Sequence, residues 1–353
     1  MKIQYRLMCL TALQLSFLFA LKGQDILNQK EKTAALIAEN EQIAQEAEVV
    51  KSLYELDNNQ MWQDITDKVL ASPDTPDEGK ESILSHGRRI ILFKYPSDHL
   101  WIKGFISFTP EPKYHPLLVI YRWGNENFAL MNPGVKFATY KDYTVISSAL
   151  RGGVSEGEDE YGGKDIDDME NLIKYIPIIS KEIGIHLNPS CLFMLGPSRG
   201  GMEMFLTIAH FPKLQKKVNK IVALSAGLDL HQAIKDRPDD IKVMFEKKFG
   251  MPAGANREEW IAKRDPLNTV KKIDQSLPIL VVQGTDDDRI SLDQGIHMVN
   301  ALKETGHHVD YWEVKGGNHV LMNQKNIMND IAHWLETNSP CMHIKLDRIS
   351  ENQ

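Results

Sequence analysis

The stretch CLFMLGPSRGGMEMF, residues 191–205, decides the fold of this chain. The run from Cys191 to Leu195 is apolar throughout, which is typical of a strand buried on both faces of a sheet. Gly-Pro-Ser-Arg-Gly-Gly then predicts a sharp turn, and Met, Glu and Phe begin a helix. An order of strand, turn and helix is the repeating unit of α/β proteins.

The turn carries the motif G-x-S-x-G, here Gly196 to Gly200. In a nucleophile elbow this motif pushes a serine hydroxyl out over the end of the sheet. Glycines two residues before and two after Ser198 avoid a clash where strand and helix almost touch. Alone, the motif is equally compatible with an ordinary Gly-Pro-Ser loop, so the rest of the chain has to decide.

The composition is that of a globular protein with a sizeable core. The chain has 353 residues, of which 42% are hydrophobic, and its net charge is −7. This length suits one large domain plus an appendage. Phosphate binding needs clustered Lys and Arg, and the chain has no long basic run, so the sequence argues against a nucleic-acid partner.

Residues 1–23 have the layout of a secretory signal peptide. Lys2 and Arg6 precede an apolar stretch at 7–21, and a small and a polar residue follow at 23–24. The apolar stretch is too short for a comfortable membrane span. We therefore predict cleavage, export to the periplasm or to the outside, and no stable membrane span afterwards. An uncleaved anchor is the alternative.

The cysteines are expected to stay unpaired after export. Cys9 leaves with the signal peptide, so the mature chain keeps Cys191 and Cys341. These two can form one disulfide. However, Cys191 belongs to a buried central strand and Cys341 to a C-terminal tail predicted at 341–353, and we favour two free thiols.

Residues 24–87 are predicted to form a helical extension and a linker. Apolar side chains recur on one helical face at Leu36, Ile43, Ala47, Val50 and Tyr54. We expect this stripe to pack on the following domain; the alternative is a short coiled-coil contact with another chain, which would make an oligomer. Residues 72–79 have the composition of a turn-rich linker.

The domain predicted at 88–340 begins with a hairpin and continues with alternating strands and helices. Residues 88–95 and 100–108 flank Pro-Ser-Asp-His and predict two antiparallel strands. Further strands are expected at 117–121, 143–149, 191–195, 220–225, 279–283 and 309–314. Repeated strand and helix units imply a mostly parallel central sheet with helices on both faces.

Two predicted helices begin with recognisable chemistry. Asp165, Asp167 and Asp168 gather where negative charge offsets the helix dipole, and we interpret them as capping residues rather than as a calcium site. Ser291 and Gln294 have the spacing of a capping box for the next such helix.

Ser198 needs two partners if it is a nucleophile, because a serine hydroxyl at its own pKa is weakly nucleophilic. A base must take its proton and a carboxylate must hold that base; in folds with a nucleophile elbow the chain order is serine, acid, histidine. Asp286 to Asp288 follow the strand at 279–283, and His319 follows the strand at 309–314. Both loops lie at the carboxyl ends of parallel strands, where open α/β sheets build their sites.

The other histidines are weaker candidates. His307 and His308 precede a strand and would point to opposite faces. His297 and His333 are predicted in helices with no acidic loop beside them. None of the four has the spacing of a metal cluster, and we predict no metal site.

Several motifs in order give the chain a family resemblance. They are RGG at 151–153, GGKDIDD at 162–168, GPSRGG at 196–201, GTDDDRI at 284–290 and GGNH at 316–319, together with the loop and strand before Tyr121. On these motifs, the region from about Tyr95 to Trp334 resembles the catalytic domain of the prolyl oligopeptidase family of serine peptidases, an α/β-hydrolase fold.

The resemblance implies a role for each matched residue. Ser198 would be the nucleophile, His319 the base and Asp287 the carboxylate, with the two neighbouring aspartates left open. The oxyanion hole would combine the backbone N–H of Arg199 with the hydroxyl of Tyr121. No metal or organic cofactor is implied.

The chain also departs from the family pattern. There is no room for the β-propeller that restricts many members to short peptides, so such gating is not expected. Arg199 follows the nucleophile where an aromatic residue is usual, and Arg-Trp-Gly-Asn at 122–125 replaces a glycine-rich loop, so selectivity is not predicted. Residues 226–277 are long enough for a lid or a pocket wall.

Together these features predict an exported serine hydrolase, a peptidase that cleaves peptide or aminoacyl bonds through an acyl-enzyme. A carboxylesterase on the same scaffold is the alternative, because ester and amide hydrolysis share the triad and the oxyanion hole. The expected substrate is accordingly a peptide or a small ester. A binding protein that keeps this fold without turnover is the hypothesis from a different class.

Overall fold

The computed structural model describes residues 50–57, 60–110, 116–127, 130–134, 140, 142–187, 190–339 and 341. The chain divides into a unit at 1–48 and a unit at 49–353, and every described residue belongs to the second. The predicted signal peptide and most of the predicted helical stripe lie outside the described residues. Within the described part, no helix is both long and apolar enough to cross a membrane.

The described strands form a single sheet of nine strands in the order β1-β2-β3-β5-β4-β6-β7-β8-β9. They are β1 (Trp62–Asp64), β2 (Arg89–Ser97), β3 (Leu100–Phe108), β4 (Leu117–Ile120), β5 (Thr144–Ser148), β6 (Leu192–Pro197), β7 (Val218–Leu224), β8 (Ile279–Gly284) and β9 (Val309–Val314). Pairing is antiparallel from β1 to β5 and parallel from β5 to β9. The predicted hairpin and mostly parallel sheet are therefore confirmed.

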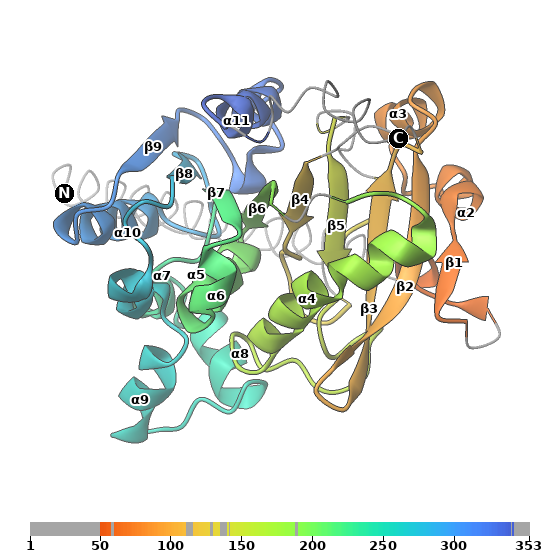
Figure 1. Cartoon of the computed structure of the whole chain (residues 1–353). Helices are drawn as coiled ribbons and strands as arrows, with labels where there is room; N and C mark the ends of the chain where they lie inside the picture. Colours follow the sequence, from red (N-terminus) through yellow and green to blue (C-terminus); the bar gives the residue numbers. More distant parts are fainter. Residues whose placement is uncertain are drawn as a thin grey trace, which may run out of the picture. The chain divides into compact units, whose positions relative to one another are not determined.

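The helices connect successive strands and cover the sheet. They are α2 (Thr66–Ala71), α3 (Asp77–Ser85), α4 (Asp165–Ile183), α5 (Arg199–His210), α6 (Pro212–Gln215), α7 (Leu230–Asp236), α8 (Ile241–Lys247), α9 (Asn256–Ala262), α10 (Leu292–Glu304) and α11 (Ile327–Glu336), with 3-10 helices η2 (Pro266–Lys272) and η3 (His319–Leu321). Figure 1 shows α4 and α5 crossing the near face of the sheet.

Alternation along the strands divides the interior into two cores, one on each face of the sheet. On β6, Leu192 and Met194 belong to the core that also contains α4, α5 and α10 side chains. Phe193 and Leu195 belong to the other core, which contains α11 side chains. Successive side chains of a strand point to opposite faces, so this pattern places helices on both faces as predicted.

The sheet begins earlier in the chain than the predicted boundary at 88. Trp62–Asp64 pair antiparallel with β2, and the Trp62 ring stacks on Phe93 with a centroid separation of 5.1 Å. The predicted linker at 72–79 extends too far along the chain, because α3 starts at Asp77. Asp77 lies in the first turn of α3, where its charge favours the helix dipole.

Cys191 and Cys341 form a disulfide, and the expectation of two free thiols is wrong. The reason is the path of the chain after α11, which returns to the end of the sheet at which the central strand β6 begins. Lys220, at the start of the neighbouring β7, donates from Nζ to the carbonyl oxygens of Trp334 and Thr337. This contact places the end of α11 beside the first residues of β6 and β7.

Candidate active site

Ser198 occupies a strained turn between β6 and α5. Its backbone has φ 51° and ψ −126°, a conformation that a non-glycine residue adopts only when its surroundings impose it. A Cβ at Gly196 would lie 2.6 Å from the carbonyl oxygen of Gly200, so strand and helix are too close for any side chain there. The sequence forms the nucleophile elbow that the glycine spacing predicts.

His319 connects the serine to a carboxylate. Its Nε2 lies 3.0 Å from Ser198 Oγ, and its Nδ1 lies 3.0 Å from both carboxylate oxygens of Asp287. With Nδ1–H donating to the carboxylate, Nε2 is free to accept the serine proton. Three loops that are far apart in sequence thus bring the predicted serine, acid and histidine within hydrogen-bonding distance.

The surroundings of Asp287 keep it ionised. Its side chain is fully buried, and it accepts hydrogen bonds from Gln283 Nε2 at 3.1 Å and from the backbone N–H groups of Arg289 and Ile290, both at 2.9 Å. Burial raises the pKa of this carboxyl, but the hydrogen bonds from His319 and the backbone outweigh burial and leave the pKa below 3.8. The carboxylate can therefore stabilise an imidazolium.

Both neighbours of Asp287 point elsewhere. Asp286 is exposed and accepts a hydrogen bond from its neighbour Thr285 through Oγ1 at 2.9 Å. Asp288 is also exposed. The geometry thus favours Asp287 among the three aspartates that follow β8.

One predicted oxyanion donor is suitably placed and the other is not. Arg199 is the first residue of α5, and the first N–H groups of a helix have no partner within it. Tyr121 is completely buried, and its hydroxyl lies 3.9 Å from Met194 Sδ in the core beneath α4 and α5. The prediction for Tyr121 is wrong because Tyr121 continues the alternation of Leu117 and Val119, which face the same core.

The loop that follows β4, residues 122–127 and here called the β4 loop, packs directly on the elbow. A Cβ at Gly200 would lie 2.6 Å from the carbonyl oxygen of Arg122 and 2.8 Å from Cβ of Tyr121. Trp123 is half-buried against the second core. The structure thus places the backbone of the β4 loop beside the first turn of α5, whereas the Tyr121 hydroxyl lies in the core.

A buried ionic cluster surrounds the side chain of Arg199. The guanidinium donates to Asp159, Asp165 and Glu203 over 2.6–2.8 Å, and each of these carboxylates is fully buried. Sequence reasoning missed this cluster. The signal that could have indicated it was Glu203 one helical turn after Arg199 inside an otherwise apolar helix.

The acidic residues at the start of α4 lie in its first turn, as predicted, and two of them also pair with arginines. Asp165 pairs with Arg199, and Asp168 pairs with Arg151 at 2.8 Å. No side-chain capping hydrogen bond is made at the residue that precedes α4. Charges that appear solvent-exposed in the sequence are turned inward because arginines from other loops meet them there.

The capping box predicted for α10 is absent. Ser291 makes no capping hydrogen bond, and its hydroxyl donates to Asp236 at 2.5 Å. Gln294 is buried, and its side-chain oxygen accepts from the backbone N–H of Leu228 at 3.1 Å. The glutamine thus fixes the loop after β7 rather than the start of its own helix.

His297 was expected to lack an acidic neighbour, and this expectation is wrong. Its Nδ1 lies 2.7 Å from Asp229 Oδ2, because the loop after β7 brings Asp229 to the side of α10. This pair is not joined to Ser198 by any hydrogen bond of the described residues, and it does not displace His319 as the candidate base. Within the described ranges, no three His, Cys, Asp or Glu side chains are grouped to hold a metal ion.

Residues 226–277, for which a lid or a pocket wall is predicted, contain α7, α8, α9 and η2. Phe245, Phe249 and Trp260 pack in a third apolar cluster with Met202 and Leu206 of α5. The same segment touches the β4 loop, where Asn125 Nδ2 lies 3.2 Å from Met244 Sδ and Glu126 pairs with Lys248 at 3.0 Å. A separate cavity of about 330 Å³, lined by Lys220 and Asp274 among others, contains none of the candidate catalytic residues.

Comparison with known families decides the assignment. The pattern of the prolyl oligopeptidase family matches residues 132–339, which is more than half of the chain. The chain belongs to the prolyl oligopeptidase family. It is accordingly a serine-type hydrolase of the peptidase class, and the resemblance that its motifs indicated is confirmed.

Among curated proteins, this prolyl oligopeptidase family member is similar to "Uncharacterized peptidase YtmA" of Bacillus subtilis (strain 168). The two are 24% identical over 257 residues, which cover 70% of this chain and 93% of the relative.

Solved structures of two peptidases share the fold. A puromycin-hydrolyzing peptidase of Mycobacterium tuberculosis matches with a TM-score of 0.55 at 15% identity, over 70% of this chain and 39% of the other. Pyrococcus horikoshii acylaminoacyl peptidase matches with a TM-score of 0.53 at 19% identity, over 69% and 39%. The chain spans about two fifths of the length of these structures.

Proposed function

We propose that this protein is an exported serine peptidase in which Ser198, His319 and Asp287 form the catalytic triad. The observation that carries the proposal is the unbroken line of hydrogen bonds from Ser198 Oγ through both nitrogens of His319 to the buried Asp287 carboxylate. A nucleophile needs this arrangement of base and orienting acid, and a merely structural serine does not.

The chemistry follows from these positions. Ser198 Oγ attacks the substrate carbonyl carbon while its proton moves to His319 Nε2, and Asp287 stabilises the imidazolium that forms. The tetrahedral intermediate collapses when the leaving amine takes the proton from Nε2, which leaves an acyl-enzyme. Water, deprotonated by the same nitrogen, then attacks the ester carbon and releases the acid and the free serine.

The oxyanion hole is proposed to consist of backbone N–H groups alone. One is the N–H of Arg199 at the start of α5. A second donor is proposed in the β4 loop, which supports this role by packing directly on Gly200. Donors held in place before the charge develops are worth a factor of about 10² to 10³ each in kcat.

The substrate is proposed to be a peptide or an aminoacyl amide. Family membership supports an amide substrate, and the solved relatives include a puromycin-hydrolyzing peptidase and an acylaminoacyl peptidase. Because the chain corresponds to only about two fifths of those proteins, their substrates are carried over here as a proposal. A carboxylesterase would use the same groups, and the experiment below distinguishes the two.

Export is proposed from two independent features. Residues 1–23 have the layout of a signal peptide. The Cys191–Cys341 disulfide supports the same conclusion, because disulfides persist in oxidising compartments.

An active-site fluorophosphonate probe tests the catalytic assignment. We expect the native protein to be labelled and Ser198→Ala to remain unlabelled while keeping its circular dichroism spectrum. Absence of labelling in the folded native protein would refute the proposed chemistry. The substrates are then ranked by the rates of hydrolysis of p-nitrophenyl esters and of aminoacyl and dipeptidyl nitroanilides. Turnover of esters alone would show that the protein is an esterase and not a peptidase.

A further inference from the structure

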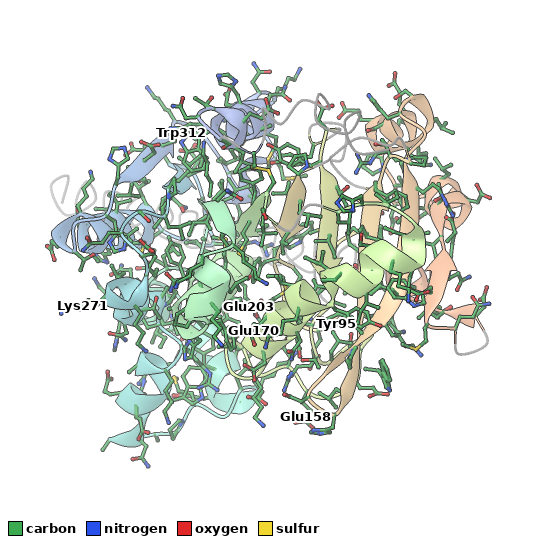
Figure 2. The ribbon with its side chains drawn as sticks, viewed as in Figure 1. Tyr95, Glu158, Glu170, Glu203, Lys271 and Trp312 are labelled. Atoms are coloured by element: carbon green, nitrogen blue, oxygen red, sulfur yellow. A yellow bond between two sulfur atoms is a disulfide. The ribbon has the colours of Figure 1, made fainter. Side chains whose placement is uncertain are left out.

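The side chain of Arg199 is immobilised directly behind the nucleophile. Its guanidinium is 3% exposed and donates to Asp159 at 2.6 and 2.7 Å, to Asp165 at 2.7 Å and to Glu203 at 2.8 Å. The ring of Tyr161 covers it with 4.4 Å between Cζ and the ring centroid. Glu203, labelled in Figure 2, lies on α5 in the middle of the molecule. The arginine therefore has one conformation and no direct access to a substrate.

The same ionic cluster also holds the β4 loop. Arg199 Nη1 donates to the side-chain oxygen of Asn125 at 2.6 Å. Asp159 Oδ2, which accepts from Arg199, also accepts from the backbone N–H of Glu126 at 3.0 Å and from Arg122 Nη2 at 2.6 Å. Arg199 Nη1 also donates to the carbonyl oxygen of Gly124 at 3.4 Å, so four residues of the loop are bonded to Arg199 or to its carboxylate partner, and all of these bonds are buried or half-buried.

The ion pairs of the cluster join more carboxylates than arginines. Arg122 and Arg199 face Asp159, Asp165 and Glu203, which would leave one excess negative charge. Burial raises the pKa of Glu203 from 4.5 to about 8, although Arg199 opposes the shift. Burial therefore favours the protonated form of Glu203, and a proton there would remove the excess negative charge.

We propose that Arg199 is a positioning residue for the oxyanion hole, because its side chain ties the β4 loop to the first turn of α5 and keeps the N–H groups of both segments aimed at one oxygen. This inference rests on the proposed function. Pre-organised donors cost no rearrangement when charge develops, whereas a displacement of about 1 Å can cost 10²-fold in rate. The arginine that replaces the family's usual aromatic residue thereby has a role without touching the substrate.

The test compares Arg199→Gln with Arg151→Gln. Arg151 is an equally buried arginine, and its partner Asp168 lies on α4, as does Asp165, a partner of Arg199. Its hydrogen bonds go to Asp168 and Asp98 and not to the β4 loop.

We expect Arg199→Gln to lower kcat on a nitroanilide or p-nitrophenyl ester about 10²-fold, with KM changed by less than about threefold. A boronic acid that forms a tetrahedral adduct should bind the variant weaker by a similar factor. The midpoint of the pH profile should not move, since His319 and Asp287 stay in place.

Arg151→Gln should lose stability but retain kcat per folded molecule. Equal losses in the two variants, or a loss in Arg199→Gln confined to KM, would overturn the inference and leave the triad intact. If Arg199→Gln does not fold, Asn125→Ala decides, because it removes the side-chain hydrogen bond between Arg199 and the β4 loop and keeps every ion pair of the cluster. It should lower kcat several-fold at unchanged KM, and native kcat would overturn the inference. Failure of the fluorophosphonate probe to label the folded native protein would instead refute the proposed function.

Discussion

At the scale of single residues, Asp287 does two things at once. It orients the imidazole of His319, and its own four hydrogen-bond donors keep it charged inside the protein. A buried carboxylate without such donors would be protonated, and it would then leave the histidine free to take the wrong tautomer. In the proposed mechanism, the loop after β8 would contribute through its backbone N–H groups as well as through its carboxylate.

Asp287→Asn is expected to fold and to lose activity by about 10⁴-fold in kcat, because an amide cannot hold the tautomer in which Nε2 accepts the serine proton. Steady-state kinetics on the best substrate, with urea unfolding to verify the fold, measure this loss. The control is Asp288→Asn, an exposed neighbour, which should keep activity within about threefold. A loss smaller than about tenfold in Asp287→Asn would transfer the orienting role to another aspartate.

Glu203 makes stability depend on pH in a direction unusual for a carboxyl. Its pKa is about 8 in the folded protein and 4.5 in the unfolded chain, so between these values the folded state binds the additional proton. The free energy of unfolding should therefore fall as pH rises from 4.5 to 8, by on the order of a few kcal/mol from this group. Glu203→Gln should remove that slope. Urea titrations at pH 5 and pH 8.5 measure it, and parallel slopes in both proteins would contradict a protonated Glu203.

The positions of Ser198, Asp287 and His319 were predictable from sequence order, and contacts that depend on three-dimensional neighbours were not. Ser198, Asp287 and His319 follow strand ends, and the sheet brings strand ends together. Tyr121 was misassigned because motif matching ignores which face its strand position selects. The spacing of Arg199 and Glu203 indicated a pair on one helix, but nothing local showed that Asp159 and Asp165 would join it inside the protein.

At the scale of elements, the two ends of the chain's C-terminal half are joined by the Cys191–Cys341 disulfide, which closes a loop of 150 residues. It connects the start of β6, the strand that leads into the elbow, to the chain that follows α11. Strand and helix positions were well predicted from apolar runs. The pairing was not, because the distance between Cys191 and Cys341 depends on how α11 packs rather than on either local sequence.

Cys341→Ser is expected to lower the free energy of unfolding by about 2–4 kcal/mol, because the unfolded chain gains the entropy that the cross-link removes. Urea unfolding with and without dithiothreitol measures the effect. Reductant should destabilise the native protein and leave Cys341→Ser unchanged. Rapid reaction of two thiols with a thiol reagent in the folded, non-reduced protein would contradict the cross-link.

At the scale of the whole molecule, the segment before β2 is part of the fold. Tyr54 is buried and its hydroxyl donates to the carbonyl of Met131 at 2.8 Å, and Lys103 donates back to the carbonyl of Tyr54 at 2.8 Å. Trp62–Asp64 cover the edge of β2. Val50 and Tyr54 were predicted to pack on this domain, and both are buried in its second core. Strand β1 was not predicted, because a strand this short leaves little periodic signal in a sequence.

A protein that starts at residue 88 is therefore expected to aggregate, whereas one that starts at residue 49 should be soluble and react with the fluorophosphonate probe. Removal of β1 would expose the paired edge of β2, and unpaired strand edges promote association. Size-exclusion chromatography and labelling measure the outcome. A monomeric, labelled protein that starts at 88 would show that the earlier residues are dispensable.

The cross-link between Cys191 and Cys341 has a practical consequence for anyone who produces this enzyme. Material made in a reducing host cytoplasm would carry two thiols where the oxidised protein has a disulfide. Its thermal half-life would then depend on the expression strain as well as on the sequence. Batches of the same polypeptide would differ in shelf life until they were oxidised. Ageing in air should make them converge.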